Sequence, residues 1–445
     1  MKLMAEVNKF KFYFGLMILN SGIIKAYDQL KKTDKFTLSE LVNYQNKHLS
    51  KIIEYSYNNI PYYKKLFDKL HLQPSDIKTI HDLYKLPILT KKDIIKNRDD
   101  FYPINSIEKY TNVSTGGSTG EPLKFRISKL NSDMSFAILL RGWGFADYNI
   151  GDKIAVIAGG SLMGKKLSLK NRLKYYILNF RSYPSYGMNE DLLKKYVDDM
   201  IRWQPQYIRG YASSVFLLAQ YIYDNKLQDN FSLKGIFTTS EMLFKNQRDF
   251  ISNVFGVDVY DTYGLNDGGI TAFECKMHNG MHIDMERGIL EVVDNYGKSI
   301  YEQEGRILAT TLTELSMPLI RYDTGDLGIV SQDKCNCGSE RPLLKQLKGR
   351  VTDTLKLNGK FIGGPVITVL MGKTNALQYQ FIQLERDKLL IKILKGEEYT
   401  DTDENFIRES VISHVGEIII MFEYVNSFHV DSGKKHKFII KMENI

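Results

Sequence analysis

A loop of hydroxyl side chains and glycines is the part of this sequence best suited to chemistry. Residues 114–122 read Ser-Thr-Gly-Gly-Ser-Thr-Gly-Glu-Pro and lie between the strand-like stretches Lys109–Val113 and Leu123–Ile127. Glycines let the backbone turn tightly and present N–H groups to an anion, and the hydroxyls add further donors. The pattern therefore predicts a loop that binds the phosphates of a nucleotide, in preference to a flexible surface turn.

Two motifs imitate other enzyme classes. Gly116–Gly120 fits the Gly-x-Ser-x-Gly pattern of hydrolases, but that elbow joins a strand to a helix, whereas the alternating Leu123–Ile127 predicts a second strand. Gly159–Lys165 resembles a Walker loop, yet Lys166 replaces the Ser or Thr that would hold magnesium. The hydrolase is therefore rejected and the P-loop NTPase is disfavoured.

Two further motifs combine an aromatic ring, glycine and acids. Asp261–Asp267 reads Asp-Thr-Tyr-Gly-Leu-Asn-Asp, and Arg321–Asp326 reads Arg-Tyr-Asp-Thr-Gly-Asp. A ring followed by glycine can form a flat shelf for a nucleobase, and a nearby carboxylate can hold magnesium. An acid such as Asp326 can accept hydrogen bonds from a ribose diol. Taken singly, the first motif is a turn after a strand and the second a salt-bridged loop.

The cysteines and nearby histidines form a candidate metal site. The chain has only three cysteines, Cys275, Cys335 and Cys337, and both His278 and His282 follow the first of them closely. A structural zinc site needs four ligands in tetrahedral geometry. We therefore predict a Cys₃His zinc site in preference to isolated buried thiols, with either histidine as the fourth ligand.

Strands and helices must position these residues. Beyond Lys109, short β-rich runs alternate with helical stretches, which predicts an α/β fold with a mostly parallel sheet covered by helices. More closely spaced strands from Gly280 to Val330 predict an antiparallel or barrel-like section, and a small α+β unit follows Arg350. The expected strands and helices are Ile154–Ala158, Tyr207–Arg209, Ser213–Asp224, Gly235–Thr239, Lys245–Val254 and Val257–Tyr260.

Composition restricts the partners and the compartment. The net charge of +8 is spread along the chain without a long basic tract, which argues against a nucleic-acid partner. Sparse cysteines indicate a reducing compartment, so we expect a cytoplasmic protein. The apolar stretch Phe10–Ile24 is interrupted by polar residues and too short to span a bilayer, which predicts a packed helix with at most peripheral membrane contact.

The motifs occur in a recognisable order. A Ser/Thr/Gly loop, Tyr-Gly with an acid, Tyr-x-Thr-Gly-Asp and Gly-Arg follow one another as in adenylate-forming ligases. Ile60–Tyr63 (Ile-Pro-Tyr-Tyr) and Leu86–Lys91 (Leu-Pro-Ile-Leu-Thr-Lys) resemble the phenylacetate–CoA ligase branch, and within it the CapK-type proteins associated with surface polysaccharide synthesis. The resemblance covers nearly the whole chain.

This resemblance implies a large N-terminal adenylation domain (residues 1–349), with mixed sheets flanked by helices and a small barrel-like section, and a mobile C-terminal α+β lid (residues 350–445). It implies that Lys434 contacts the reacting carboxylate and the α-phosphate, although adjacent Lys435 stays an alternative, and that Asp267 holds magnesium. Thr352-Asp353 would be the hinge, and His282 is favoured over His278 for zinc. The remaining implied ligands are Ser114, Thr115, Gly116, Gly117, Ser118 and Thr119 for phosphates, Ser240, Glu241, Asp261, Thr262, Tyr263 and Gly264 for the adenine and acyl pocket, and Asp326 and Arg350 for ribose.

The predicted activity is ATP- and Mg²⁺-dependent activation of a carboxylic acid, followed by transfer to coenzyme A or to another thiol, an amine or a hydroxyl. Two positions depart from the family pattern, since Asp267 replaces the usual glutamate and Thr352 the usual aspartate. Two alternatives therefore stay open: an AMP-transferring nucleotidyltransferase, and a catalytically degenerate scaffold in polysaccharide assembly. A homodimer is compatible with the sequence.

Overall fold

The N-terminal part of the chain is helical. The computed structural model describes residues 2–19, 21–105, 109–114, 123–158, 169–185, 188, 190–243, 245–350, 354–363, 367, 370–371, 374–396, 398–426, 428 and 438–441. The first elements are α1 (Lys2–Ile18), α2 (Ile23–Thr33), α3 (Leu38–Asn59), α4 (Pro61–Leu70), η1 (Pro74–Asp76), η2 (Ile80–Lys85), α5 (Lys91–Lys96) and η3 (Arg98–Phe101). Local signals fix their starts: Pro61 opens α4, and Thr90 and Asp93 form a capping box at the start of α5.

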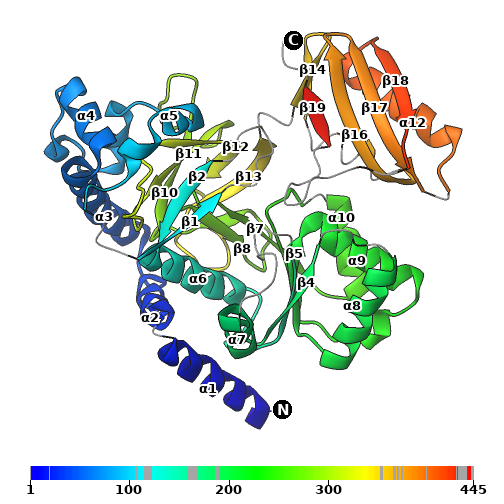
Figure 1. Ribbon diagram of the computed structural model, residues 1–445, viewed down its shortest axis with the longest axis horizontal. Coiled ribbons are helices and arrows are strands. Elements are labelled where there is room, and N and C mark those ends of the chain that lie inside the picture. Colours follow the sequence, from blue (N-terminus) through cyan, green and yellow to red (C-terminus); the bar gives the residue numbers. More distant parts are fainter. Residues whose placement is uncertain are drawn as a thin grey trace.

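One large sheet forms the centre of the molecule (Figure 1). Among the described residues it has eleven strands, in the order β10-β11-β12-β13-β9-β8-β7-β6-β5-β3-β4. Strands β3 to β7 pair in parallel, and every pairing from β7–β8 to β10–β11 is antiparallel. The bounds are β3 (Ile154–Ala158), β4 (Phe180–Pro184), β5 (Tyr207–Tyr211), β6 (Gly235–Thr239), β7 (Val259–Gly264), β8 (Thr271–Glu274), β9 (Met281–Ile283), β10 (Gly288–Val293), β11 (Gly305–Thr311), β12 (Tyr322–Ser331) and β13 (Leu343–Arg350).

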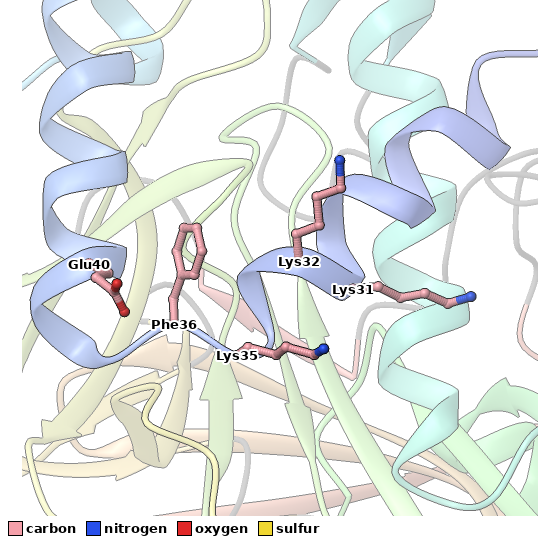
Figure 2. A pocket seen from close by; sticks show the side chains of 5 residues that line it. All are labelled: Lys31, Lys32, Lys35, Phe36 and Glu40. Carbon is pink, nitrogen blue, oxygen red and sulfur yellow. The ribbon is translucent and has the colours of Figure 1, made fainter.

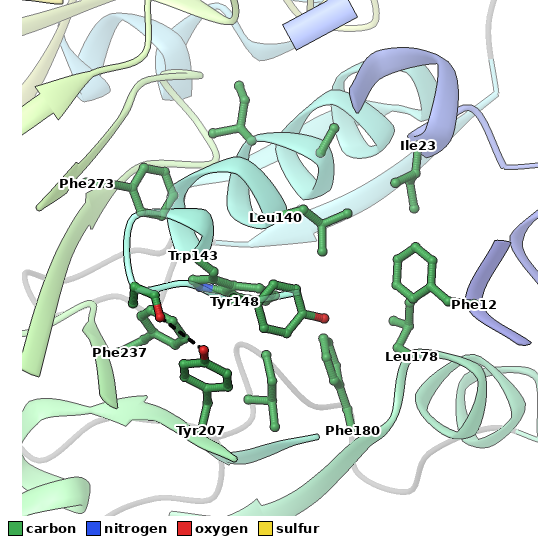
Figure 3. Close-up of a cluster of buried hydrophobic side chains, with 14 of the residues drawn as sticks. Phe12, Ile23, Leu140, Trp143, Tyr148, Leu178, Phe180, Tyr207, Phe237 and Phe273 are labelled. Carbon is green, nitrogen blue, oxygen red and sulfur yellow. Dashed lines mark hydrogen bonds between the residues drawn. The ribbon is translucent and has the colours of Figure 1, made fainter. Parts of the chain in front are cut away.

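Helices cover both faces of the parallel half. The strand residues alternate: Val156 and Tyr207 pack with α6, whereas Ile157 and Ile208 pack with α8–α10. Figure 3 shows the first of these cores, where Trp143 stacks on Phe237 and the Tyr207 hydroxyl donates to the carbonyl of Ala146. The covering helices are α6 (Lys129–Gly144), α7 (Leu169–Leu178), α8 (Glu190–Trp203), α9 (Ala212–Asp224) and α10 (Lys245–Phe255), with η4 (Gln228–Asn230) after α9.

Helix α6 approaches the sheet closely at Gly142. A Cβ atom at this position would overlap the ring of Phe273 in β8, so the contact requires glycine. The hairpin of β1 (Tyr110–Ser114) and β2 (Lys124–Ser128) lies just before α6 and frames the predicted phosphate loop. The second strand expected from Leu123–Ile127 is therefore confirmed.

The C-terminal unit has a sheet of its own (Figure 1, upper right). Four strands in the order β18-β17-β16-β19 share a core with α12 and with the hairpin β14-β15. The bounds are β14 (Thr354–Leu357), β15 (Lys360–Gly363), β16 (Ala376–Glu385), β17 (Lys388–Lys395), α12 (Asp401–Val415), β18 (Ile419–Tyr424) and β19 (Ile439–Lys441). The predicted fold class, a large α/β part followed by a small α+β part, is confirmed, and the exact boundary at residue 350 stays a prediction.

Three expectations need correction. Residues 322–326 lie inside strand β12, so the second motif is not a loop, whereas the first motif ends β7 at Gly264 and continues into a turn at residues 266–267. The section from Gly280 to Val330 is antiparallel as expected, but it continues the parallel strands because β7 and β8 are hydrogen-bonded to each other. The apolar stretch Phe10–Ile24 is divided between two helices, since α1 ends at Ile18 and α2 begins at Ile23.

Candidate active site and metal site

The predicted nucleotide residues lie where the sheet changes from parallel to antiparallel. Ser240 and Glu241 follow the carboxyl end of β6, and Tyr263-Gly264 ends the neighbouring strand β7. Ser240 has a positive φ of 66°, so the chain turns sharply as it leaves the strand. Ligands of open α/β sheets bind outside the carboxyl ends of strands, at such switch points.

Tyr263 and Asp326 connect the two aromatic–acidic motifs. The Tyr263 hydroxyl donates a hydrogen bond to Asp326 Oδ2 at 2.8 Å, between side chains 63 residues apart, and both residues are buried. Burial, with the neighbouring Asp326 carboxylate, raises the pKa of Tyr263 well above its usual value. The phenol therefore stays protonated and continues to donate.

The backbone around Asp326 is also fixed. Gly325 adopts a positive φ of 77°, and the Asp326 amide donates to Thr324 Oγ1 at 3.1 Å. In the β12–β13 ladder Asp326 is the register partner of Arg350, the last residue of β13. The two residues expected to bind ribose are therefore neighbours on adjacent strands, at the point where the chain leaves the main sheet.

Asp261 packs within the sheet. Its Oδ1 accepts a hydrogen bond of 2.7 Å from Thr238 in β6, and its amide donates to Glu274 at 2.8 Å. Burial, assisted by the Glu274 charge, raises the pKa of Asp261 to about 6. Glu274 in turn is held by Arg248 of α10. These contacts give Asp261 a role in joining β6 and β7, while Thr262 beside it is also buried.

Arg287 is a buried cation that the sequence did not single out. Its Nε donates to Asn131 Oδ1 at 2.9 Å, and one terminal nitrogen, Nη2, has no hydrogen-bond partner among the described residues. Burial lowers the pKa of Arg287 to about 10, and carboxylates including that of Asp267 oppose the shift. Asp267 also contributes to the raised pKa of Tyr263, behind burial and Asp326. The predicted magnesium ligand therefore lies near both Tyr263 and Arg287.

Glu314 ties the phosphate-loop hairpin to this network. Its carboxylate accepts from the Ser128 amide at 2.9 Å and from Asn131 Nδ2 at 2.9 Å. Ser128 ends β2 and caps α6 through the Asn131 amide. Burial raises the pKa of Glu314. Because these are single polar residues brought together from distant segments, no local sequence signal predicted them.

The segments Ile60–Tyr63 and Leu86–Lys91, which carried the family resemblance, bind the backbone at the start of strand β12. The Leu89 amide donates to the carbonyl of Arg321, and the Asp323 amide donates to the carbonyl of Leu89, at 3.0 and 2.9 Å. The Tyr63 hydroxyl donates to the carbonyl of Pro318 and accepts from the Ile320 amide. The N-terminal helical layer therefore holds the start of the β12 motif.

Several predicted residues lie outside the described part of the chain. Thr115 to Thr119, Thr352, Asp353, Lys434 and Lys435 belong to this group. Ser114 and Arg350 are described as the last residues of β1 and β13, by backbone only.

Four side chains gather at the predicted metal site. The donor atoms of Cys275, His282, Cys335 and Cys337 all lie within 4.8 Å of one another. The Cys275 and Cys335 sulfurs are 3.6 Å apart, and Cys337 Sγ is 3.2 Å from His282 Nε2. Burial lowers the pKa of His282 to about 4, so its ring is neutral. His278 instead contacts Glu274, with 3.3 Å between Nδ1 and Oε2.

A buried ionic cluster borders this group. Glu286 accepts from Arg141 and from Arg341, each at 2.7 Å, and from the Thr33 hydroxyl at 2.5 Å. Asp284 also pairs with Arg141. The cluster joins α2, α6 and the segment after β9, and it was not predicted from the sequence.

Comparison with known proteins gives this geometry a family context. Residues 354–442 match the family model described as the CapK C-terminal domain. Protein CapK of Staphylococcus aureus is 25% identical over 426 residues, which cover 93% of this chain and 92% of CapK. The predicted resemblance to adenylate-forming ligases is confirmed. The phenylacetate-coenzyme A ligase of Thermus thermophilus is also 25% identical, over 86% of this chain and 85% of the ligase.

Solved structures agree on the fold of these adenylate-forming ligase relatives. The crystal structure of 2-hydroxyisobutyryl-CoA ligase in the postadenylation state superposes with a TM-score of 0.75 at 20% identity, covering 93% of this chain and 92% of the ligase. An anthranilate CoA ligase in complex with anthranoyl-AMP gives a TM-score of 0.52 at 16% identity, covering 74% and 66%. By sequence and fold, the chain is therefore similar to adenylate-forming, acid–thiol ligase-like enzymes.

Proposed function

We propose that this protein activates a carboxylic acid with ATP as an acyl-adenylate and then transfers the acyl group to coenzyme A or another acceptor. The hydrogen bond between Tyr263 and Asp326 is the observation that carries the proposal. It joins the motif proposed to hold the base to the motif proposed to hold the ribose, at the switch point of the sheet. A nucleotide site requires both motifs together.

The proposed nucleotide contacts divide among three parts of the chain. The loop from Ser114 to Thr119 holds the phosphates, Tyr263-Gly264 with Ser240 and Glu241 borders the adenine and the acyl group, and Asp326 and Arg350 hold the ribose. The contact between Glu314 and the Ser128 amide supports this arrangement, because it fixes the strand that follows the loop.

The proposed reaction has two steps. A carboxylate oxygen of the acid attacks the α-phosphorus of ATP, the new O–P bond forms, and the bond to the β-phosphate oxygen breaks so that pyrophosphate leaves. An acceptor thiol, amine or hydroxyl then attacks the acyl carbon, loses its proton, and AMP leaves. Lys434 is proposed to place its ammonium group where negative charge gathers in the first step. Magnesium held by Asp267 would neutralise charge on the departing phosphates.

We propose that Cys275, His282, Cys335 and Cys337 bind a structural zinc ion. Three sulfurs and one imidazole within 4.8 Å are the donor set and number that tetrahedral zinc prefers. Four protein ligands leave no open coordination position, so the ion would stabilise the fold rather than take part in the reaction. The ion would connect the segment after β12, which carries Cys335 and Cys337, to the end of β8 and to β9.

The proposed setting is the cytoplasm and surface polysaccharide synthesis. The resemblance to CapK supports the second point, and the sparse cysteines support the first. Within the described ranges, no helix is both long enough and apolar enough to cross a membrane.

ATP–pyrophosphate exchange against a panel of aryl, fatty and amino acids tests the proposal. We expect exchange with one acid class in the wild type and a loss of at least about 100-fold in Lys434→Ala, because that cation stabilises transition-state charge. Lys435→Ala is the matched control and should retain exchange.

Each other outcome is informative. Measurable ATP binding without exchange for any acid would favour the degenerate scaffold. Stable incorporation of AMP into the product would favour the nucleotidyltransferase. Exchange retained in Lys434→Ala and lost in Lys435→Ala would transfer the role to the neighbouring lysine.

A further inference from the structure

Helix α1 is held against the fold by one face only. Phe12 and Leu16 are almost completely buried in the core shared with α6, and Phe12 points into that cluster in Figure 3. Gly15 lies against Ile177 of α7 so closely that a Cβ atom would overlap its side chain. Lys11 Nζ donates to Asn179 Oδ1 at 2.5 Å. These contacts fix how the helix is rotated about its axis.

The opposite face of α1 presents large apolar side chains to solvent. At 3.6 residues per turn, five of them fall within an arc of about 100°. Phe10 and Phe14 stack with 5.6 Å between ring centroids. The five, which we call the apolar stripe, are between 47% and 68% exposed: Val7, Phe10, Phe14, Met17 and Ile18.

Helix α7 extends this apolar surface. It packs against α1, and its Leu173 and Tyr176 are 50% and 68% exposed. The ring of Tyr176 lies under the ammonium group of Lys11, with 4.5 Å between Nζ and the centroid. Isolated exposed apolar residues are normal, but seven on two packed helices indicate an interaction surface.

Lysines border the stripe on α2 and just after it. Met17 of the stripe shares an open hollow of about 710 Å³ with Lys25 and Lys32. A second hollow of about 700 Å³ is lined by Lys31, Lys32 and Lys35. Figure 2 shows the three lysine side chains of this second hollow extending away from the ribbon. All four lysines are exposed.

We propose that α1 and α2 dock this protein on an anionic lipid bilayer. A helix with an exposed apolar stripe beside lysines can lie in the plane of a membrane, with the stripe among the acyl chains and the ammonium groups at the phosphates. Charge complementarity favours this partner, since residues 1–35 contain seven lysines against three acidic residues. The proposal concerns a surface outside the nucleotide motifs and does not depend on adenylation.

Sedimentation of the full-length protein with lipid vesicles tests the proposal. Vesicles of phosphatidylcholine with phosphatidylglycerol should bind the wild type, whereas pure phosphatidylcholine should bind at least about tenfold more weakly. Phe10→Ser/Phe14→Ser should weaken binding at least about tenfold, because the variant lacks the two rings that would be buried among the acyl chains. Lys31→Glu/Lys32→Glu should do the same and should reduce the dependence on salt.

Matched controls exclude general surface effects. Ile104 is as exposed as Phe10, and Lys194 and Lys195 form an exposed pair on α8. Ile104→Ser and Lys194→Glu/Lys195→Glu should bind vesicles as the wild type does. The proposal is overturned if the wild type does not sediment with phosphatidylglycerol at low salt, or if the phenylalanine variant binds normally. It is also overturned if ultracentrifugation shows a dimer that the phenylalanine variant dissociates, because a second copy then covers the stripe.

Discussion

Replacing Tyr263 with phenylalanine removes one oxygen atom from the contact that joins the two nucleotide motifs. The hydroxyl donates to Asp326 Oδ2 at 2.8 Å, and both side chains are buried. A hydrogen bond to a charged group contributes about 1.5–3 kcal/mol, roughly twice the value for neutral partners. We therefore expect Tyr263→Phe to lower the free energy of unfolding by about 1.5–3 kcal/mol.

The same strand provides a matched control. Tyr260 is also buried in β7, but its hydroxyl lies 3.4 Å from Asp258 Oδ2, a long and weak contact. Tyr260→Phe removes the same atom and should cost less than about 1 kcal/mol. The difference between the two variants isolates the bond to Asp326 from the general effect of removing a buried hydroxyl.

Two measurements follow for each variant. Urea unfolding at pH 7 gives the stability difference, and pyrophosphate exchange at varied ATP gives kcat/KM. We expect Tyr263→Phe to lower kcat/KM for ATP about tenfold, because Asp326 loses a group that orients it toward the ribose. Equal stability losses in the two tyrosine variants would refute the importance of this bond, and an unchanged kcat/KM would separate it from nucleotide binding.

Two further predictions concern the metal site and a buried acid. Mass spectrometry should find roughly one zinc per wild-type chain and none in His282→Ala, which should also have a lower melting temperature, whereas His278→Ala should retain the metal; zinc kept by His282→Ala would contradict the ligand set. The raised pKa of Asp261, about 6, means that the folded state binds its proton more tightly than the unfolded state, so this residue makes stability fall as pH rises from about 4 to 6. Asp261→Asn should flatten that part of the urea-midpoint profile relative to Asp258→Asn, and parallel profiles would contradict the assignment.

Local patterns were sufficient to predict many individual elements. The β-rich runs Ile154–Ala158 and Gly235–Thr239 became β3 and β6 with the expected bounds, since β-branched and aromatic residues are typical of short strands. The Thr90–Asp93 capping box is a similarly local signal at the start of α5, because both of its hydrogen bonds join residues three positions apart.

Long-range pairings could not be predicted in this way. The bond from Arg287 to Asn131 spans 156 residues, and neither residue belongs to a recognisable motif. The motif order predicted that Tyr263 and Asp326 belong to one site, but it did not predict the hydrogen bond between them. The start of β7 was set two residues early, at Val257, because pairing with neighbouring strands rather than composition decides where a strand begins.

The contacts of Tyr63 also bear on how the chain folds during synthesis. Its hydroxyl reaches the backbone of Ile320, 257 residues further along the chain. At 5–20 residues per second, a ribosome needs roughly 10–50 s to make that intervening stretch. Throughout this interval the apolar face of α3 and α4, including Phe67, lacks the residues of β10–β12 that later cover it. The N-terminal helices are therefore an exposed substrate for chaperones until synthesis has passed β12.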